Sequence, residues 1–307
     1  MSNNLPTVKF KIENSLTKKH YAFLAKYSTK HSQNVIKGQV SKFAEYAELR
    51  GIGIASVNQD DILLYSEYLR GQKLSNSTYN SRLSGLKSYL EFIGIKGLSY
   101  PFQKVNAYAK VRIIAEKDFI NIIRYLRLEK MKSGKKQTKF LRDYLMLSML
   151  FFTGLRKSEV LNLKYADIQQ EGDLYFYNTV GKGNKEIKKL FPNQLVSDLF
   201  QLRDLEKKKL SDFLFTSHYK VTATRLADNA LNRILNQYNQ LVNQRAHKVT
   251  VHGIRNLSAS KLYSLDKDIL KTQQHLNHAN LNTTQIYLAK LQNTKIDYYD
   301  QMQEALA

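Results

Sequence analysis

The chain has 307 residues, no cysteine and a formal net charge of +22, with 48 Lys and Arg residues against 26 Asp and Glu residues. The absence of cysteine excludes disulfide bonds and thiolate metal sites, and the length leads us to expect two domains. So positive a charge indicates a polyanionic partner. Residues 1–112 carry +10 and the remainder +12, as a clamp around a nucleic-acid duplex requires, although a ribosomal or other RNA-binding protein would share this charge.

Nothing in the sequence predicts a membrane segment. The longest apolar run, Tyr144–Leu155, is interrupted by Ser148 and Thr153 and is shorter than the roughly 20 residues needed to span a bilayer. The first residues, MSNNLPTVKFK, contain no apolar signal segment. We therefore expect no membrane association and a cytoplasmic, nucleoid-associated protein.

Residues 15–94 are predicted to form a bundle of four amphipathic helices after a short N-terminal tail, residues 1–14. Apolar residues recur at helical spacing, and polar residues mark the starts of two helices: Asn58 for the third, and Ser75 or Asn76 for the fourth. The outer faces are basic. This pattern fits a bundle that binds DNA, and it also fits an ordinary helical domain with solvated lysines.

Residues 95–112 are predicted to be a linker. They contain Gly97, Pro101 and several Lys and Arg residues, and they show little periodicity. A second domain is expected over residues 113–307, where the pattern indicates further helices and one small β-sheet. The predicted fold class is therefore mainly α with a small sheet, in two domains.

Arg156, in the sequence TGLRKSE, lies where a buried helix is expected to end and the next to begin. A rigid core would then hold its guanidinium at a surface cleft, and Glu159 is placed to orient it. Taken alone, the motif would favour a helix-end arginine that simply pairs with Glu159.

Residues Ile168–Leu190 change to a two-residue period and include the glycine-rich sequence GKGNK, which predicts a β-hairpin or small sheet. Lys182 and Lys185 lie in its turn, where a lysine flanked by glycines can reach into a groove. The spacing is not that of a phosphate-binding Walker loop. A solvated basic turn remains the alternative.

The C-terminal part contains two further motifs. His252 and Arg255, in HGIRNLS, are three residues apart and are expected on one face of a helix start. His278 and Tyr287 follow, nine residues apart, in KTQQHLNHANLNTTQIYLAK. A tyrosine hydroxyl, with a pKa near 10, is a weak nucleophile at neutral pH and needs cationic neighbours that stabilise the charged species. The sequence supplies such neighbours in these motifs.

We predict no metal and no cofactor. His275 and His278 could suggest a metal pair, but the nearby carboxylates are limited to Asp266 and Asp268, and the chain has no cysteine.

Together these motifs resemble the tyrosine recombinase (phage integrase) family, and more closely its short Xer-like members. The resemblance covers roughly residues 110–290, with TGLRKSEVLNLKYADI and QHLNHANLNTTQIYL its most diagnostic parts. Asn277 stands where the family usually has Gly, and Asn256 where it commonly has His. The short segment before Leu16 favours a simple Xer-like recombinase over a large phage integrase, which carries an extra arm-binding domain.

The resemblance implies an N-terminal core-binding (SAM-like) bundle and a C-terminal catalytic domain. It implies cleavage and rejoining of double-stranded DNA at paired half-sites, through a 3′-phosphotyrosyl intermediate, in a homotetramer and without ATP or metal. A second recombinase or an accessory protein remains an open alternative. The residues that the resemblance places in the active site are Arg156, Lys182, His252, Arg255, His278 and Tyr287.

In the implied mechanism the two arginines bind the scissile phosphate, Lys182 protonates the leaving 5′ oxygen, His252 assists deprotonation of Tyr287, and His278 bonds the phosphate. Two alternatives stay open: DNA relaxation of the type IB topoisomerase kind, and a basic DNA-binding protein without activity. The apolar stripe of Ile296, Tyr299, Met302 and Leu306 predicts a C-terminal helix that docks either on its own domain or on a neighbouring protomer.

Overall fold

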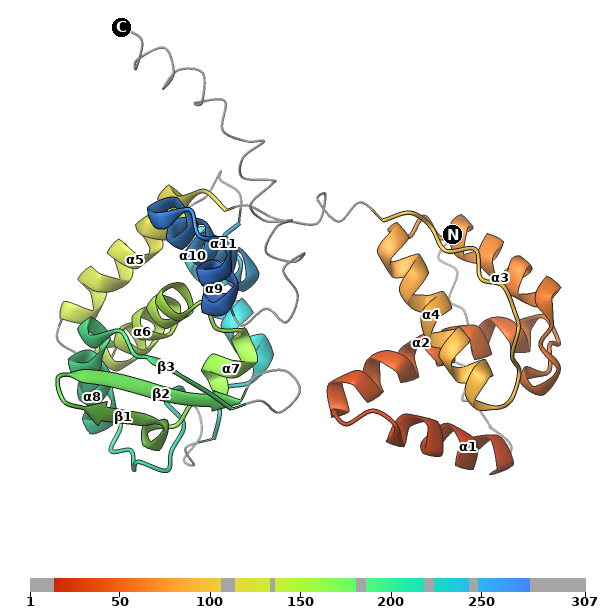
Figure 1. Cartoon of the computed structure of the whole chain (residues 1–307), viewed down its shortest axis with the longest axis horizontal. Helices are drawn as coiled ribbons and strands as arrows, with labels where there is room; N and C mark the ends of the chain where they lie inside the picture. The colour runs from red at the N-terminus through yellow and green to blue at the C-terminus, as the bar shows by residue number, and fades with distance from the viewer. Residues whose placement is uncertain are drawn as a thin grey trace, which may run out of the picture. The chain divides into compact units, whose positions relative to one another are not determined.

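The computed structural model describes residues 14–105, 114–132, 136–180, 186–217, 224–242 and 248–276. The chain divides into two compact units, Met1–Asn106 and Ala107–Ala307 (Figure 1). Within the described residues the protein is mainly helical with one three-stranded sheet, as predicted. No helix in these ranges is long and apolar enough to cross a membrane.

The described part of the N-terminal unit contains four α-helices. Asn58 caps the third helix in a capping box with Asp61, and the Ser75 hydroxyl accepts a hydrogen bond from the backbone N–H of Thr78 at the start of the fourth. Both predicted helix starts are therefore confirmed. The helices are α1 (Asn14–Ala25), α2 (Lys30–Leu49), α3 (Gln59–Gly71) and α4 (Asn76–Phe92).

The core of this unit is aromatic and aliphatic, with Phe43, Tyr65 and Leu86 fully buried at its centre. Helices α2 and α4 pack against each other across Gly85. A Cβ atom at Gly85 would lie 2.1 Å from Oε1 of Gln39, so a glycine is needed for the two helices to approach this closely.

The segment that follows α4 packs on the N-terminal unit as far as the structure describes it. Gln59 exchanges hydrogen bonds with the backbone of Ser99 at 2.8 and 3.0 Å, and Asn80 does the same with Gln103 at 2.7 and 2.8 Å. Tyr100 packs against the aromatic core. Residues 95–105, which belong to the predicted linker, are therefore held along α3 and α4.

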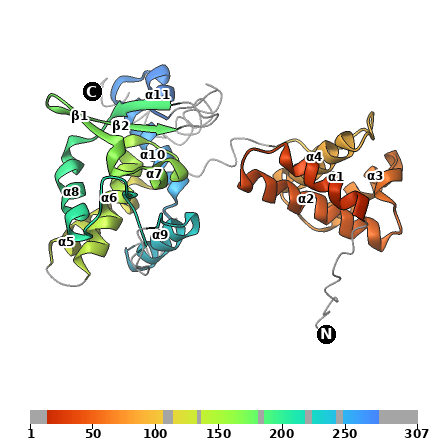
Figure 2. The same cartoon turned by 90° about the horizontal axis from the view of Figure 1, so that it is seen from below.

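The second unit contains helices on the faces of a buried α6, and a small sheet beside them (Figures 1 and 2). Its helices are α5 (Glu116–Met131), α6 (Gln137–Thr153), α7 (Lys157–Asn162), α8 (Val196–Leu205), α9 (Asp228–Val242), α10 (Val251–Asp266) and α11 (Ile269–Leu276). Its strands are β1 (Ile168–Glu171), β2 (Leu174–Val180) and β3 (Glu186–Leu190).

Helix α6 is the centre of the second unit. Leu145, Met146 and Leu150 on α6 are fully buried, and the helix packs against α5, α7, α8 and α10. Its first half also buries an ion pair, because Arg142 donates hydrogen bonds to Asp143 at 2.6 and 2.9 Å. The hydroxyl of Tyr238 on α9 donates to the same carboxylate at 2.6 Å.

The sheet has the order β1-β2-β3, and both pairs of strands are antiparallel. Tyr177 on β2 is buried and lies directly opposite Lys189 on β3. Directly opposite residues of an antiparallel pair point to the same face of the sheet. Lys189 is therefore on the covered face with Tyr177, and its neighbour Lys188 is on the other.

Candidate active site

Gly154 forms the turn between α6 and α7 that places Arg156. Its φ of +59° is in the left-handed region that favours glycine. A Cβ atom at this position would also lie 2.8 Å from Nε2 of His275, which packs against the turn from α11. Conformation and packing therefore both require glycine here, and they bring α11 onto the TGLR turn.

Arg156 lies at the N-terminus of α7 and is oriented by Glu159. The Glu159 carboxylate accepts a hydrogen bond from the Arg156 backbone N–H at 2.7 Å and another from its guanidinium at 2.9 Å. The Glu159 side chain is 5% exposed and the Arg156 side chain 33% exposed. A buried anion thus holds a partly exposed cation, which is the orienting role predicted for Glu159.

Arg255 lies at the start of the second turn of α10 and is only 5% exposed. Its guanidinium donates to the carbonyl of Gly154 and to the carbonyl of Leu276. These bonds connect α10 to the TGLR turn and to the last residue of α11. The spacing of His252 and Arg255 predicted that both lie on one face of a helix. It did not predict that the arginine side chain is buried.

His252 is the exposed member of that pair. Partial burial of the imidazole, followed by the positive charge of Arg255, lowers its pKa from the usual 6.5. The neutral ring, which can accept a proton, is therefore the favoured form at neutral pH.

The other predicted site residues, Lys182, His278 and Tyr287, lie outside the described residues. Lys185, the alternative lysine of the hairpin turn, lies outside them as well. The structure thus brings together Arg156, Arg255 and the end of the helix that precedes His278 in the sequence.

Lys189 and His275 also belong to this site, and Lys189 is not among the residues predicted from the sequence. The ammonium of Lys189 donates to the carbonyls of Gln274 at 2.8 Å and His275 at 2.6 Å. Nε2 of His275 lies 2.9 Å from the hydroxyl of Ser258. Two adjacent lysines on a predicted strand were the available signal, because one of the two had to face the interior.

The pKa of His275 is lowered to about 4, mainly by burial and further by the positive charges of Lys189 and Arg255. This imidazole is therefore neutral. Among the residues that the structure describes, no three His, Asp or Glu side chains are grouped so that they could hold a metal ion.

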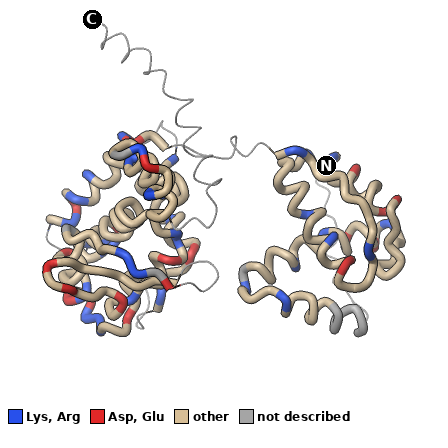
Figure 3. The backbone as a smooth tube through the Cα atoms, in the orientation of Figure 1, with Lys and Arg blue, Asp and Glu red and all other residues tan. Residues whose placement is uncertain are grey.

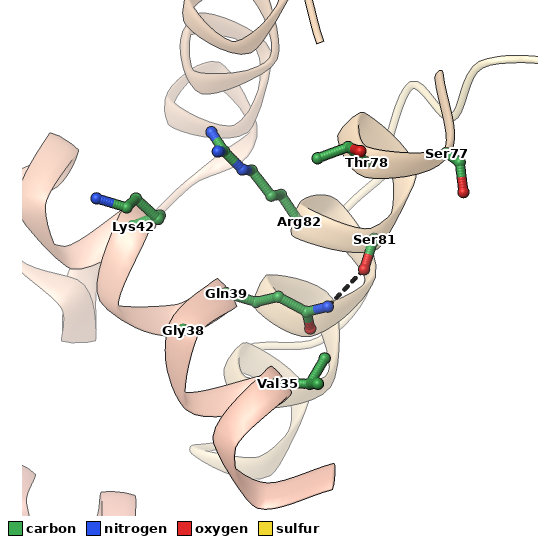
Figure 4. A pocket seen from close by; sticks show the side chains of 8 residues that line it. All are labelled: Val35, Gly38, Gln39, Lys42, Ser77, Thr78, Ser81 and Arg82. Carbon is green, nitrogen blue, oxygen red and sulfur yellow. Dashed lines mark hydrogen bonds between the residues drawn. The ribbon is translucent and has the colours of Figure 1, made fainter. Parts of the chain in front are cut away.

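A second candidate surface is a groove between α2 and α4 of the N-terminal unit. Figure 4 shows Lys42 and Arg82 on its two helices, and Gln39 spans from α2 to the Ser81 hydroxyl, at 2.5 Å. The floor and walls are otherwise made of small residues, among them Gly38 and Ser77. Lys and Arg residues are distributed over both units in Figure 3.

Comparison with known proteins decides the family. The phage integrase family model matches residues 124–294, which is more than half of the chain. The chain belongs to the phage integrase family.

Curated relatives of this integrase-family chain are named tyrosine recombinases. The tyrosine recombinase XerH of Campylobacter jejuni is 31% identical over 160 residues, which cover 52% of this chain and 44% of that relative. A tyrosine recombinase of Pseudothermotoga lettingae is 28% identical over 274 residues, covering 87% of this chain and 90% of the relative.

Solved integrase-family structures share the fold. A post-cleavage complex of the XerH recombinase with palindromic difH substrate matches with a TM-score of 0.68 at 20% identity, over 98% of this chain and 90% of that one. A lambda integrase dimer bound to a core site matches with a TM-score of 0.62 at 14% identity, over 89% and 75%. The predicted resemblance and fold class are confirmed, and this integrase-family chain is a Xer-like tyrosine recombinase. The topoisomerase-like and inactive alternatives are not favoured.

Proposed function

We propose that this recombinase cleaves and rejoins double-stranded DNA through a 3′-phosphotyrosyl intermediate at Tyr287. The observation that carries the proposal is the pair of carbonyl bonds made by Arg255. One reaches Gly154, two residues before Arg156, and the other reaches Leu276, two residues before His278. A single buried guanidinium thus joins the three sequence motifs that hold the proposed catalytic groups.

Arg156 and Arg255 would bind the non-bridging oxygens of the scissile phosphate. Negative charge grows on these oxygens in the transition state, and cations fixed beforehand stabilise it more than mobile ones. The ion pair with Glu159 fixes Arg156, and the two carbonyl bonds fix Arg255. No metal is needed in this role, because the guanidinium groups supply the positive charge.

Proton transfer would be divided among the remaining groups. His252 would take the proton of Tyr287, a role supported by its lowered pKa, which keeps the imidazole neutral. Lys182 would protonate the leaving 5′ oxygen, and His278 would donate a hydrogen bond to the phosphate. These two assignments rest on the family resemblance.

The proposed partner is duplex DNA. The net charge of +22 supports it, and so does the groove in which Lys42 and Arg82 lie on facing helices, because ammonium and guanidinium groups bind backbone phosphates. Several structural neighbours are themselves recombinases in complex with DNA. We propose that the N-terminal unit binds the duplex backbone through this groove.

Two half-sites on each of two duplexes would be occupied by a homotetramer. The second unit, called the catalytic unit from here on, has an apolar groove lined by Phe119 of α5, Phe152 of α6 and Leu257 of α10, and Phe152 remains 42% exposed. The apolar stripe near the C-terminus in the sequence would fill this groove on a neighbouring protomer. Deletion of Lys295–Ala307 should then leave binding of one half-site intact and remove cooperative binding of two, as gel-shift titration can measure.

The proposed chemistry is tested with a library of nicked suicide duplexes, in which cleavage releases a short strand and traps the covalent complex. Sequencing the DNA in denaturation-resistant adducts would identify the cleaved site. Tyr287→Phe should form no adduct, with duplex affinity nearly unchanged, because one hydroxyl contributes little to an interface dominated by phosphates.

The matched controls are Tyr298→Phe and Tyr299→Phe, which change the two tyrosines that follow in the sequence. Both should form adducts at the wild-type rate. Adduct formation by the Tyr287→Phe protein would show that the nucleophile is another residue.

A further inference from the structure

Lys189 is a charged side chain on the covered face of the small sheet. It lies opposite the buried Tyr177, and its ammonium reaches α11 on the far side of the site. Its neighbour Lys188 faces the other way, where its ammonium bonds Glu171 at 2.5 Å and lies 4.8 Å from the centre of the Phe176 ring. Adjacent lysines on one strand therefore have quite different surroundings.

Lys189 and Arg255 together bind the C-terminal end of α11. Lys189 donates to the carbonyls of Gln274 and His275, and Arg255 donates to the carbonyl of Leu276. The last carbonyls of a helix have no partner within it, and they carry the negative end of the helix dipole. Two cations from two different elements thus hold three consecutive carbonyls.

The surroundings of Lys189 are unfavourable for its positive charge. The pKa of Lys189 is lowered to about 8, mainly by burial and further by the positive charges of Arg255 and Arg156. The negative charge of Glu159 opposes this shift. A lowered lysine pKa means that the surroundings disfavour the charged form of the side chain.

We propose that Lys189 is a positioning residue for strand cleavage. Together with Arg255 it fixes the end of α11, and with it the point from which the chain continues toward His278 and Tyr287. The inference rests on the function proposed above. A nucleophile displaced by about 1 Å can react about a hundredfold more slowly, so a fixed starting point for this segment has kinetic consequences.

The charge on Lys189 should matter, because an ammonium bonds the helix end more strongly than a neutral amine does. The charged or titratable groups around it are Arg156 and Glu159 at α7, Arg255 on α10, His275 on α11 and Tyr177 on β2. Burial raises the pKa of Tyr177 and is the main cause that lowers that of His275 to about 4. A guanidinium is not deprotonated in proteins. Between pH 7 and 9, Lys189 is therefore the member of this group that loses a proton.

The test uses the full-length protein and the nicked duplex most enriched among wild-type adducts. Lys189→Met removes the charge and keeps much of the side-chain volume, and Lys189→Arg keeps the charge at every pH. Lys188→Met is the matched control on the same strand. The measurements are the rate of adduct formation, duplex affinity by gel shift, and the midpoint of thermal unfolding.

We expect Lys189→Met to form the adduct ten to about a hundred times more slowly, with duplex affinity and unfolding midpoint close to wild type. Lys188→Met should match wild type in all three. Relative to its own rate at pH 7, Lys189→Arg should be faster than wild type at pH 9, because the wild-type lysine has lost its charge by then. A purely structural residue would not produce this difference in pH profile.

The outcomes separate the two proposals. Absence of any wild-type adduct would overturn the proposed function, and this inference with it. Wild-type adducts accompanied by an equal rate for Lys189→Met would overturn the role of Lys189 alone. Loss of unfolding midpoint and duplex affinity together with the rate would make Lys189 a structural residue and would likewise overturn it.

Discussion

The two units of this recombinase differ in where their charged side chains lie. In the described part of the N-terminal unit, the buried side chains are apolar, aromatic or, at Ser66, a hydroxyl, and the Lys and Arg side chains stay at least partly in solvent. The catalytic unit buries charges in its interior, among them Arg142, Asp143, Glu159 and Arg255. Each of these makes a hydrogen bond or an ion pair.

This difference separates the cations that attract a polyanion from the cations that act in the reaction. Exposed cations draw a polyanion from solution and adapt to its backbone, and salt screens their effect. Buried cations are desolvated and held by specific partners, so they present fixed charges to a fixed point. We therefore expect substitutions in the N-terminal unit to change affinity and salt dependence, and substitutions around the site to change rate.

The largest effect on stability should come from breaking the buried network of the catalytic unit. Asp143→Asn leaves Arg142 charged and buried without its carboxylate, and it weakens the bond from Tyr238. Removing one partner of a buried pair should lower the free energy of unfolding by about 3–5 kcal/mol. The matched change in the N-terminal unit is Glu45→Gln, which breaks the exposed pair with Lys42 and should cost at most about 1 kcal/mol. Denaturant unfolding of both variants measures the contrast, and equal losses would contradict it.

The largest effect on rate should come from Arg156→Ala. Loss of a fixed cation at the phosphate should slow adduct formation by about 10²–10³ while duplex affinity changes little. Glu159→Gln keeps Arg156 but replaces the anion that orients it, and it should cause a smaller loss of rate. Single-turnover kinetics at saturating protein separates rate from affinity. Wild-type kinetics in Arg156→Ala would remove this arginine from the site.

Much of the fold could be predicted from the sequence because local signals agreed with the final structure. Asn58 and Ser75 mark helix starts by their own side-chain bonds, and the change of period over Ile168–Leu190 marks the sheet. Some boundaries could not be predicted. Helix α9, for example, begins at Asp228 and not a few residues earlier, because Arg225 forms a β-bridge with Thr216.

The site contacts that lie within one sequence motif were predicted. The contacts that depend on packing between distant segments were missed. Arg156 with Glu159 is a local pair, three residues apart, and its geometry follows from spacing. Lys189 binds carbonyls 85 and 86 residues away, and Arg255 binds one 101 residues away. No local pattern contains such contacts, because they depend on how α10, α11 and the sheet pack together.

A moderate effect on affinity should follow from removing the groove cations of the N-terminal unit. Lys42→Met and Arg82→Met should each weaken duplex binding, and each should reduce the slope of log affinity against log salt concentration by about 1. The rate of adduct formation at saturating protein should not change. Lys87→Met, on the same helix as Arg82 but outside the groove, is the control, and like Lys42 it pairs with a nearby glutamate. Unchanged salt slopes in the two groove variants would show that the groove does not contact phosphates.

The smallest effect concerns the pH at which cleavage begins to fail. Burial and a neighbouring cation lower the pKa of His252 in the catalytic unit, and they lower that of His20 in the N-terminal unit as well, where the cation is Lys37. Both imidazoles should therefore stay mostly neutral when the pH falls to 6.5. If His252 is the base, only its titration should appear in the rate.

The wild-type protein should accordingly keep more than about half of its adduct-forming rate at pH 6.5 and lose it only at lower pH, as His252 gains a proton. His20→Gln should leave this acid limb unchanged, whereas His252→Gln should be slow throughout and should lack the limb. Histidine titration by NMR gives both pKa values independently. An acid limb that survives in His252→Gln would assign the proton transfer to a different group. An acid limb that follows the pKa of His20 would do the same, and it would place a titrating residue of the reaction outside the charge network of the catalytic unit.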